Sequence, residues 1–194
     1  MFALARHIHI SNVSMRNGEW NKKHYTGIEL GGKTLGLFGM GRIAYEVAKR
    51  AQALGMEIVY TDIRGKLEDR DMFEYVEVNE LLRRSDFISL HIPFDKEHGA
   101  TILNEQFELM KYGVYIINAA RGGVVCEKAL LDALNSGKVA GAGVDVFEEE
   151  PTKNQELINH PRVCATPHIG ASTVEAQERI GGETVRVIKD FFNL

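Results

Sequence analysis

The stretch from Thr34 to Ala44 reads T-L-G-L-F-G-M-G-R-I-A, and it decides the fold of this chain. A short apolar run comes first, Gly39 and Gly41 follow it, and a segment with helical periodicity begins at Arg42. This order predicts a strand, a tight turn and a helix. The two glycines let the backbone approach a pyrophosphate, whose charge is stabilised by the free N–H groups at the start of the helix. Ala44 stands at the third glycine of the G-x-G-x-x-G pattern, where only a small residue is needed.

An acidic residue strengthens this dinucleotide-binding prediction. Asp62 ends the next apolar run, 57–61, about twenty residues after the glycine turn. A carboxylate at that place accepts hydrogen bonds from the two hydroxyls of a ribose and repels a 2′-phosphate. The sequence therefore predicts NAD in preference to NADP, with Arg64 two residues later as a source of ambiguity. The plain alternative is an ordinary strand-to-helix turn followed by a solvated aspartate.

Beyond this unit, apolar runs alternate with segments of helical periodicity. The strands are predicted near 34–38, 57–61, 86–90, 114–118, 140–145 and 162–165, and the helices near 42–54, 79–84, 104–110 and 127–136. Such alternation predicts an α/β fold of the Rossmann type, a doubly wound parallel sheet with helices on both faces and right-handed crossovers.

Several local features of the helices are predicted as well. Asn104 and Ser172 are expected to cap helices, and Ser172 pairs with Glu175 in a capping box that opens a long final helix. Gly181 and Gly182 predict a bend in that final helix. Three apolar side chains mark the face that the first sheet-covering helix is expected to bury: Ile43, Val47 and Leu54.

Length and composition describe one globular domain. The chain has 194 residues, a net charge of −4 and 44% hydrophobic residues, which is enough to bury a core. Lysine and arginine do not cluster, so no nucleic-acid partner is expected. No apolar run has membrane-spanning length and no signal peptide is recognisable, which predicts a cytoplasmic protein without a membrane partner. Cys126 and Cys164 are too few for a disulfide framework or a zinc site, and no metal is expected.

The first 32 residues have a different character. Phe2, Leu4 and Ile8 predict an apolar helix that Met1 interrupts, and we expect the natural protein to begin earlier. The segment 11–30 is polar and irregular, and Trp20 is one of only two large apolar anchors in it. Such an arm is expected to lie on another surface, which predicts a homodimer.

Three polar motifs follow predicted strands: NAARGGVV (118–125), DVFEEEP (145–151) and TPHIGAST (166–173). In an open parallel sheet the ligand lies beyond the carboxyl ends of the strands, so Arg121, Glu150 and His168 are candidate site residues. Taken singly, each has an ordinary explanation as a loop cation, a solvated acid or a turn residue. Together they provide the guanidinium, carboxylate and imidazole that hydride transfer to a 2-oxo acid requires.

The chain resembles the NAD-binding domain of the D-isomer-specific 2-hydroxyacid dehydrogenases over essentially its whole length. The resemblance rests on these motifs together with GMGRIA (39–44), Asp62, LHIP (90–93) and PHIGASTVEAQ (167–177). Within that family the phosphoglycerate dehydrogenases are the most similar group. The resemblance implies that Arg121, Glu150 and His168 are catalytic. It implies cofactor contacts, with Asp62 at the ribose and Ala119, Asp145 and Gly170 near the nicotinamide, from the following residues: Gly39, Met40, Gly41, Arg42, Ile43, Asp62, His91, Ile92, Pro93, Ala119, Ala120, Arg121, Asp145, His168, Gly170 and Ala171.

The resemblance also implies a division into domains. Residues 1–194 are expected to form the NAD-binding domain, with an N-terminal helix and arm at 1–32, and the smaller substrate-binding domain of the family is absent from this chain. The implied function is hydride transfer between NAD and a small 2-hydroxy acid, with 3-phosphoglycerate in serine biosynthesis as the expected substrate. Alternatives are a hydroxypyruvate or glyoxylate reductase, and an NAD-sensing dimeric binding protein that resembles the C-terminal-binding-protein corepressors.

Overall fold

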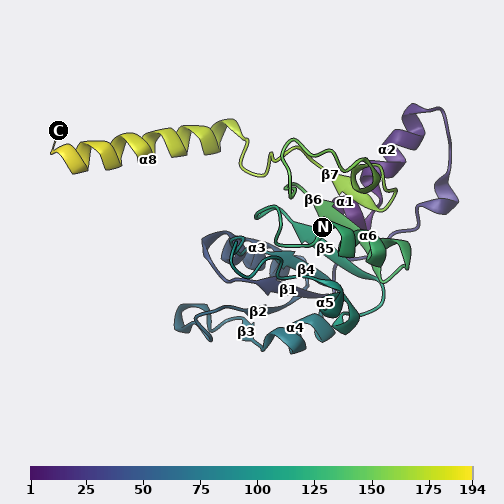
Figure 1. The fold of residues 1–194 in the computed structure, drawn as a ribbon, viewed down its shortest axis with the longest axis horizontal. Coiled ribbons are helices and arrows are strands. Elements are labelled where there is room, and N and C mark those ends of the chain that lie inside the picture. The colour runs from purple at the N-terminus through teal and green to yellow at the C-terminus, as the bar shows by residue number, and fades with distance from the viewer. Residues whose placement is uncertain (194) are drawn as a thin grey trace.

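A computed structural model of the chain, described for residues 1–193, contains a single seven-stranded sheet (Figure 1). The strand order is β3-β2-β1-β4-β5-β6-β7, and every neighbouring pair is parallel. The strands are β1 (Thr34–Phe38), β2 (Glu57–Thr61), β3 (Glu74–Tyr75), β4 (Phe87–Leu90), β5 (Val114–Asn118), β6 (Val139–Val144) and β7 (Val163–Ala165). The predicted doubly wound parallel sheet is confirmed, and its order reverses between β1 and β4, where ligands bind in such folds.

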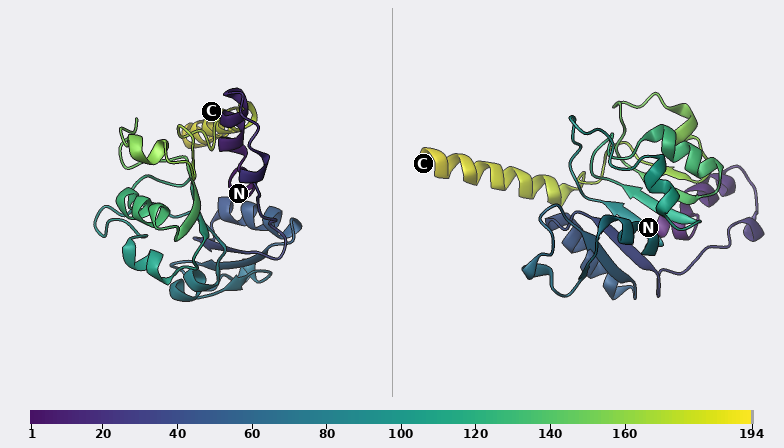
Figure 2. Two further views of the ribbon diagram at one scale, coloured as in Figure 1. Left: turned by 90° about the vertical axis from the view of Figure 1, so that its right-hand side faces the viewer. Right: turned by 60° about the horizontal axis from the view of Figure 1, so that its bottom comes forward.

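Helices cover both faces of this sheet (Figure 2). They are α1 (Phe2–Ala5), α2 (Ile8–Arg16), α3 (Arg42–Ala53), α4 (Val78–Arg84), α5 (Asn104–Leu109), α6 (Glu127–Asn135), α7 (Gln155–Ile158) and α8 (Val174–Phe192), with 3₁₀ turns at Lys22–His24 and Glu68–Arg70. Helices α1 and α3 lie on one face, and α4, α5 and α6 on the other.

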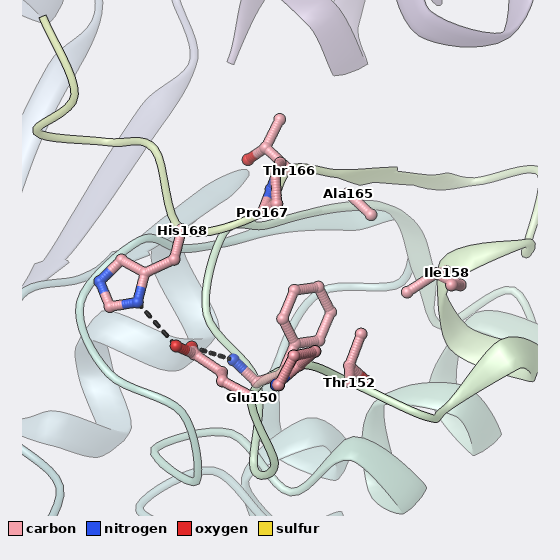
Figure 3. Close-up of a pocket in the computed structure, with 9 residues that line it drawn as sticks. Glu150, Thr152, Ile158, Ala165, Thr166, Pro167 and His168 are labelled. Atoms are coloured by element: carbon pink, nitrogen blue, oxygen red, sulfur yellow. Dashed lines mark hydrogen bonds and ion pairs between the residues drawn. The ribbon is translucent and has the colours of Figure 1, made fainter.

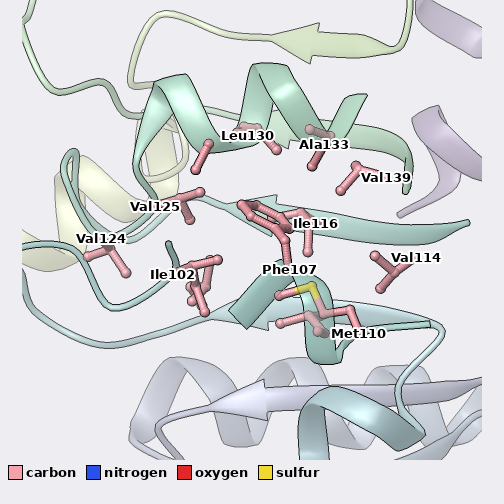
Figure 4. Close-up of a cluster of buried hydrophobic side chains, with 14 of the residues drawn as sticks. Ile102, Phe107, Met110, Val114, Ile116, Val124, Val125, Leu130, Ala133 and Val139 are labelled. Atoms are coloured by element: carbon pink, nitrogen blue, oxygen red, sulfur yellow. The ribbon is translucent and has the colours of Figure 1, made fainter. Parts of the chain in front are cut away.

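Two hydrophobic cores fill the space between the helices and the sheet. One lies under α4, α5 and α6 and includes Phe107, Ile116 and Leu130 (Figure 4). The second lies under α3 and includes Leu35 and Tyr60. Because helices cover both faces, all five residues of β1 are buried, which explains its continuous apolar sequence. Each large side chain buried in this way contributes about 1.5–3 kcal/mol to folding.

Helix α3 does not bury the face that its large residues predict. Its buried residues are Ala44, Ala48 and Ala51, whereas the Ile43 side chain is 73% exposed and Leu54 lies just past the end of the helix, also exposed. The prediction for Ile43 and Leu54 is therefore wrong. A stripe of alanines lets the helix axis approach the sheet closely, so Ile43 is turned outward beside the glycine turn.

The caps of two helices also differ from the prediction. Thr173, not Ser172, caps α8: its hydroxyl accepts a backbone N–H bond at 3.1 Å, and its backbone is extended. Leu103 is the N-cap of α5, which makes Asn104 the first helical residue, and the Gln106 side chain accepts the Leu103 N–H bond at 2.9 Å. In both helices the N-cap lies one position from the residue that the sequence predicted. The N-cap is the last residue with an extended backbone before the helix, whatever its side chain.

Helix α8 runs unbroken through Gly181 and Gly182. It has no buried residue, and it projects away from the body of the domain (Figure 1). None of the helices within residues 1–193 is both long enough and apolar enough to cross a membrane.

Three short elements lie outside the predicted pattern. Helix α2 occupies part of the segment predicted to be irregular, β3 adds a two-residue edge strand, and α7 is a single turn beside β7. The remainder of the arm follows α2 at the surface, where the Trp20 side chain is 79% exposed.

Candidate active site

The glycine turn joins β1 to α3 in the form that the sequence predicts. Gly39 has a φ of 82°, and a Cβ atom there would lie 2.8 Å from the carbonyl oxygen of His91. Gly41 is the N-cap of α3, no side chain among the described residues caps this helix, and the space beside Gly41 is open. Free N–H groups, helix dipole and open space together fit a pyrophosphate at this turn.

Asp62 reaches back from the end of β2 to this turn. Its carboxylate accepts the Met40 N–H bond at 2.9 Å and is also bound by Arg64, through Nε at 2.8 Å and Nη2 at 2.9 Å. The Asp62 side chain is 6% exposed. The guanidinium of Arg64 and the Met40 N–H hold the pKa of Asp62 well below its usual value, so it is a carboxylate at neutral pH.

His91 lies at the end of β4, on the other side of the glycine turn. Its backbone N–H donates to the carbonyl oxygen of Phe38 at 2.8 Å, and its imidazole Nε2 lies 3.0 Å from the hydroxyl of Ser89. Burial lowers the pKa of His91 to about 4, so this imidazole is neutral at pH 7. Together, β1, β2 and β4 surround the turn with polar groups of fixed orientation.

The loop after β5 is held by a buried side chain that the sequence reasoning did not single out. Asn118 donates to the carbonyl of Arg121 at 3.0 Å and accepts the Ala120 N–H bond at 3.2 Å. The Arg121 side chain is exposed. A Cβ atom on Gly122 would collide with the carbonyl of Phe147, so this loop packs directly on the loop after β6. Asn118 could have been identified from the sequence, because it is a polar residue at the end of an apolar strand.

Asp145 fixes the turn after β7. Its carboxylate accepts the Thr166 hydroxyl at 2.5 Å and the N–H groups of Ile169 and Gly170 at 2.9 and 2.8 Å. Burial opposes ionisation, but these hydrogen bonds keep the pKa of Asp145 below its usual value. His168 lies inside this turn with a φ of 55°, a conformation that few non-glycine residues adopt. Thr166 is a further residue that the sequence reasoning missed.

The Nδ1 atom of His168 lies 2.8 Å from Oε2 of Glu150 (Figure 3). The other carboxylate oxygen of Glu150 accepts the Phe147 N–H bond at 3.0 Å. These two hydrogen bonds lower the pKa of Glu150. Because a carboxylate only accepts, Nδ1 of His168 carries the hydrogen, which leaves Nε2 as the basic nitrogen. In Figure 3, Nε2 points away from the side chains that line the neighbouring pocket.

That pocket has a volume of about 570 Å³ and a mostly apolar wall (Figure 3). It is lined by Phe147, Glu150, Pro151, Thr152, Ile158, Ala165, Thr166, Pro167 and His168. It therefore lies behind the Glu150–His168 pair, opposite Nε2.

The strand order brings the predicted site residues together at one end of the sheet, where the carboxyl ends of the parallel strands lie. Arg121 follows β5, Asp145 and Glu150 follow β6, and His168 follows β7, and these three strands are consecutive in the sheet. The glycine turn follows β1 and Asp62 follows β2, so they lie at the carboxyl ends of strands in the other half of the sheet. Both cysteines are free, and residues 1–193 contain no group of three or more side chains placed to bind a metal ion.

Comparison with protein families gives one match that covers most of the chain. Residues 1–170 match the model of the D-isomer specific 2-hydroxyacid dehydrogenase, NAD binding domain. The chain belongs to this family. It is therefore an NAD-binding domain, and the proteins of this family are oxidoreductases that act on CH–OH groups.

Individual relatives agree with this assignment. A hydroxypyruvate reductase of Thermotoga maritima is 50% identical over 97% of this chain and 62% of its own length. A D-3-phosphoglycerate dehydrogenase of Methanocaldococcus jannaschii is 46% identical over 97% of this chain and 37% of its own length. Among solved structures, a D-lactate dehydrogenase of Aquifex aeolicus complexed with NAD and lactic acid superposes with a TM-score of 0.87 at 36% identity, covering 99% of this chain and 63% of that one. The chain thus spans less than two thirds of the length of these dehydrogenases.

Proposed function

We propose that the protein containing this domain transfers a hydride between NAD and a D-2-hydroxy acid, with His168 as the acid/base. The observation that carries the proposal is the 2.8 Å hydrogen bond between His168 and Glu150 at the carboxyl edge of the sheet. It fixes the tautomer of the imidazole and leaves Nε2 free to accept the proton of a substrate hydroxyl. The carboxylate beside Nδ1 stabilises the imidazolium that forms when Nε2 takes that proton.

Arg121 has the second role in this proposal. Its guanidinium is exposed, and Asn118 orients the loop that carries it, so it is available to bind the carboxylate of a substrate through paired hydrogen bonds. Bound beside the same carbon, the cation also polarises the neighbouring carbonyl in the reductive direction.

The cofactor site uses the other half of the edge. Gly39, Gly41 and Arg42 would hold the pyrophosphate, Asp62 the ribose, and Asp145 the region of the nicotinamide. When bound, NAD supplies the acceptor of the hydride. The turn geometry at Gly39 and the anchored carboxylate of Asp62 support this arrangement.

We propose 3-phosphoglycerate as the substrate, oxidised in the formation of serine, as the motifs of the chain imply. Hydroxypyruvate is the second candidate, because the relative at 50% identity is a hydroxypyruvate reductase. The experiment is turnover by the full-length protein with 3-phosphoglycerate and NAD, and with hydroxypyruvate, glyoxylate and other 2-oxo acids and NADH. A kcat/KM for 3-phosphoglycerate at least tenfold above the values for the other acids supports the assignment. A preference for hydroxypyruvate or glyoxylate would replace it, and NAD binding without turnover of any acid would indicate a binding protein.

We also propose that the domain forms a homodimer through its N-terminal arm. Trp20 remains 79% exposed in one chain, and an aromatic ring of that size gains stability when a partner covers it. Light scattering should give twice the monomer mass, and a Trp20→Glu variant should dissociate. A wild-type chain that is monomeric at about 50 µM, where a specific dimer of this kind is expected to be populated, contradicts the proposal.

A further inference from the structure

The carboxylate of Asp62 has no acceptor position left for a ribose. One oxygen accepts from the Arg64 N–H at 3.1 Å and from Arg64 Nε at 2.8 Å. The other accepts from the Met40 N–H at 2.9 Å and from Arg64 Nη2 at 2.9 Å. Two oxygens with two donors each have used their four lone-pair sites. Asp62 is thus fully occupied by groups of its own chain.

A ribose diol needs two of these sites, and the guanidinium of Arg64 is the donor that can leave. The two backbone N–H groups are fixed by the glycine turn and by the chain direction after β2. The Arg64 side chain, in contrast, is 60% exposed while Asp62 is 6% exposed, so the guanidinium is the partner that can turn into solvent and be hydrated there. Binding of an adenosine ribose at Asp62 therefore requires that Arg64 swing outward into solvent.

We propose that Arg64 determines how strongly this domain discriminates between NAD and NADP. Against NAD the guanidinium acts as an internal competitor for Asp62. Against NADP it is the group that turns outward to bind the 2′-phosphate, since a planar fork of donors suits a phosphate and offsets the repulsion from Asp62. The proposal rests on dinucleotide binding by this family, and it does not depend on the catalytic roles proposed above.

Two consequences follow for binding. The unaltered domain should prefer NAD, but by a narrow margin of about tenfold or less, because Arg64 weakens the binding of one dinucleotide and aids the other. Removing the guanidinium should increase the preference for NAD over NADP, because it should strengthen NAD binding and weaken NADP binding. NAD should bind about two- to fivefold more tightly, as expected when a guanidinium whose net pairing is weakened by its exposure to solvent no longer competes for Asp62. NADP should bind about tenfold or more less tightly, as expected for loss of a charged hydrogen bond.

The test is isothermal titration of NAD, NADP, adenosine 5′-monophosphate and adenosine 2′,5′-bisphosphate into the 194-residue chain and into Arg64→Ala and Arg64→Lys variants. Lysine keeps the charge without the fork, so it should free Asp62 for NAD while losing less NADP affinity than alanine does. Arg83→Ala is the matched control, because it removes the same charge from another exposed residue. Arg83 lies near the end of α4, which leads into the amino end of β4, at the end of the sheet opposite Asp62. Its affinities should match those of the unaltered chain.

A second readout follows the side chain itself. The Nε–H resonance of Arg64, assigned by its loss in Arg64→Lys, should shift when NAD is added and shift differently with NADP. Equal changes in NAD and NADP affinity in Arg64→Ala, or no change in either, would overturn the proposal. Failure of the unaltered chain to bind any of the four nucleotides would overturn dinucleotide binding itself, a result distinguishable from a failure confined to Arg64.

Discussion

Three buried polar side chains lie at the ends of neighbouring strands: Ser89 in β4, Asn118 in β5 and Asp145 after β6. A buried polar group without a partner is destabilising, and each of these has one. Their partners belong to His91, to the loop of Arg121 and to the turn of His168. Buried groups therefore fix His91 and the loops that carry Arg121 and His168 at the carboxyl ends of the strands.

His91 makes the stability of the domain sensitive to mild acid. Its pKa is lowered to about 4 in the folded chain by burial, against 6.5 in an unfolded chain. Between these values only the unfolded state binds the proton, so the free energy of unfolding decreases as the pH falls from 6.5 to 4, by at most about 3 kcal/mol. Urea unfolding across this range should show that decrease in the unaltered chain and a smaller one in His91→Gln. Parallel pH dependences for the two chains would contradict the burial of a neutral imidazole; His24→Gln, at an exposed histidine, is the control.

The Glu150–His168 pair predicts a graded loss of activity in the full-length protein. His168→Ala should lower kcat by about two to four orders of magnitude, the usual effect of losing a positioned acid/base. Glu150→Gln should also lower kcat and should shift its pH profile, because the amide cannot stabilise an imidazolium in the same way. Glu149→Gln, in the same acidic run but paired with Lys153, should leave kcat unchanged. A near-normal kcat in His168→Ala would remove that residue from the role.

At the scale of elements, the sequence predicted those units that contain an apolar run or a clear helical period. The strand-turn-helix unit from β1 to α3 and the strands that follow are examples. It did not predict β3 or α7, which contain no apolar run, and it described most of α2 as irregular because that segment is largely polar. The motifs placed Arg121, Glu150 and His168 at one edge, but not Asn118 or Thr166, whose partners are known only once separate loops are brought together.

The contact between α4 and β1 depends on a residue without a side chain. A Cβ atom on Gly36 would collide with Ser85 and lie 2.7 Å from Leu81, both of them fully buried. Gly36→Ala should therefore destabilise the domain by about 1–3 kcal/mol through overpacking. Gly143→Ala is the matched control in β6, where the nearest atom would be at an ordinary 3.7 Å. Its free energy of unfolding should change by less than about 1 kcal/mol, and equal effects of the two substitutions would contradict this account of the packing.

At the scale of the whole molecule, one long helix extends beyond the packed sheet. Helix α8 leaves the domain just after the turn of His168, and none of its residues is buried. Apolar side chains recur along it at helical spacing, and Val185, Ile188 and Phe192 are among those exposed. A helix with a wide apolar face requires a covering surface for its stability. The part of the sheet that carries the proposed acid/base is also open, since the side chains of His168 and Glu150 are 51% and 38% exposed.

This openness predicts that the 194-residue chain binds NAD but does not turn over substrate. The proposed pyrophosphate and adenosine contacts lie between Gly39 and Asp62, within the packed domain, so binding should need only the folded domain. Hydride transfer needs the reacting carbon within about 3–3.5 Å of its partner in a site that excludes water. Arg121 and His168 face solvent here, and one exposed charged contact does not orient a small anion.

Calorimetry should therefore detect NAD binding with a dissociation constant of about 1 µM or higher. No NADH should form when 3-phosphoglycerate and NAD are supplied together. The full-length protein assayed at the same concentration is the positive control, and its activity should depend on Arg121. Steady NADH formation by the 194-residue chain that disappears in Arg121→Ala would show that the open edge orients the substrate unaided, and that closure over the site is not required for the reaction.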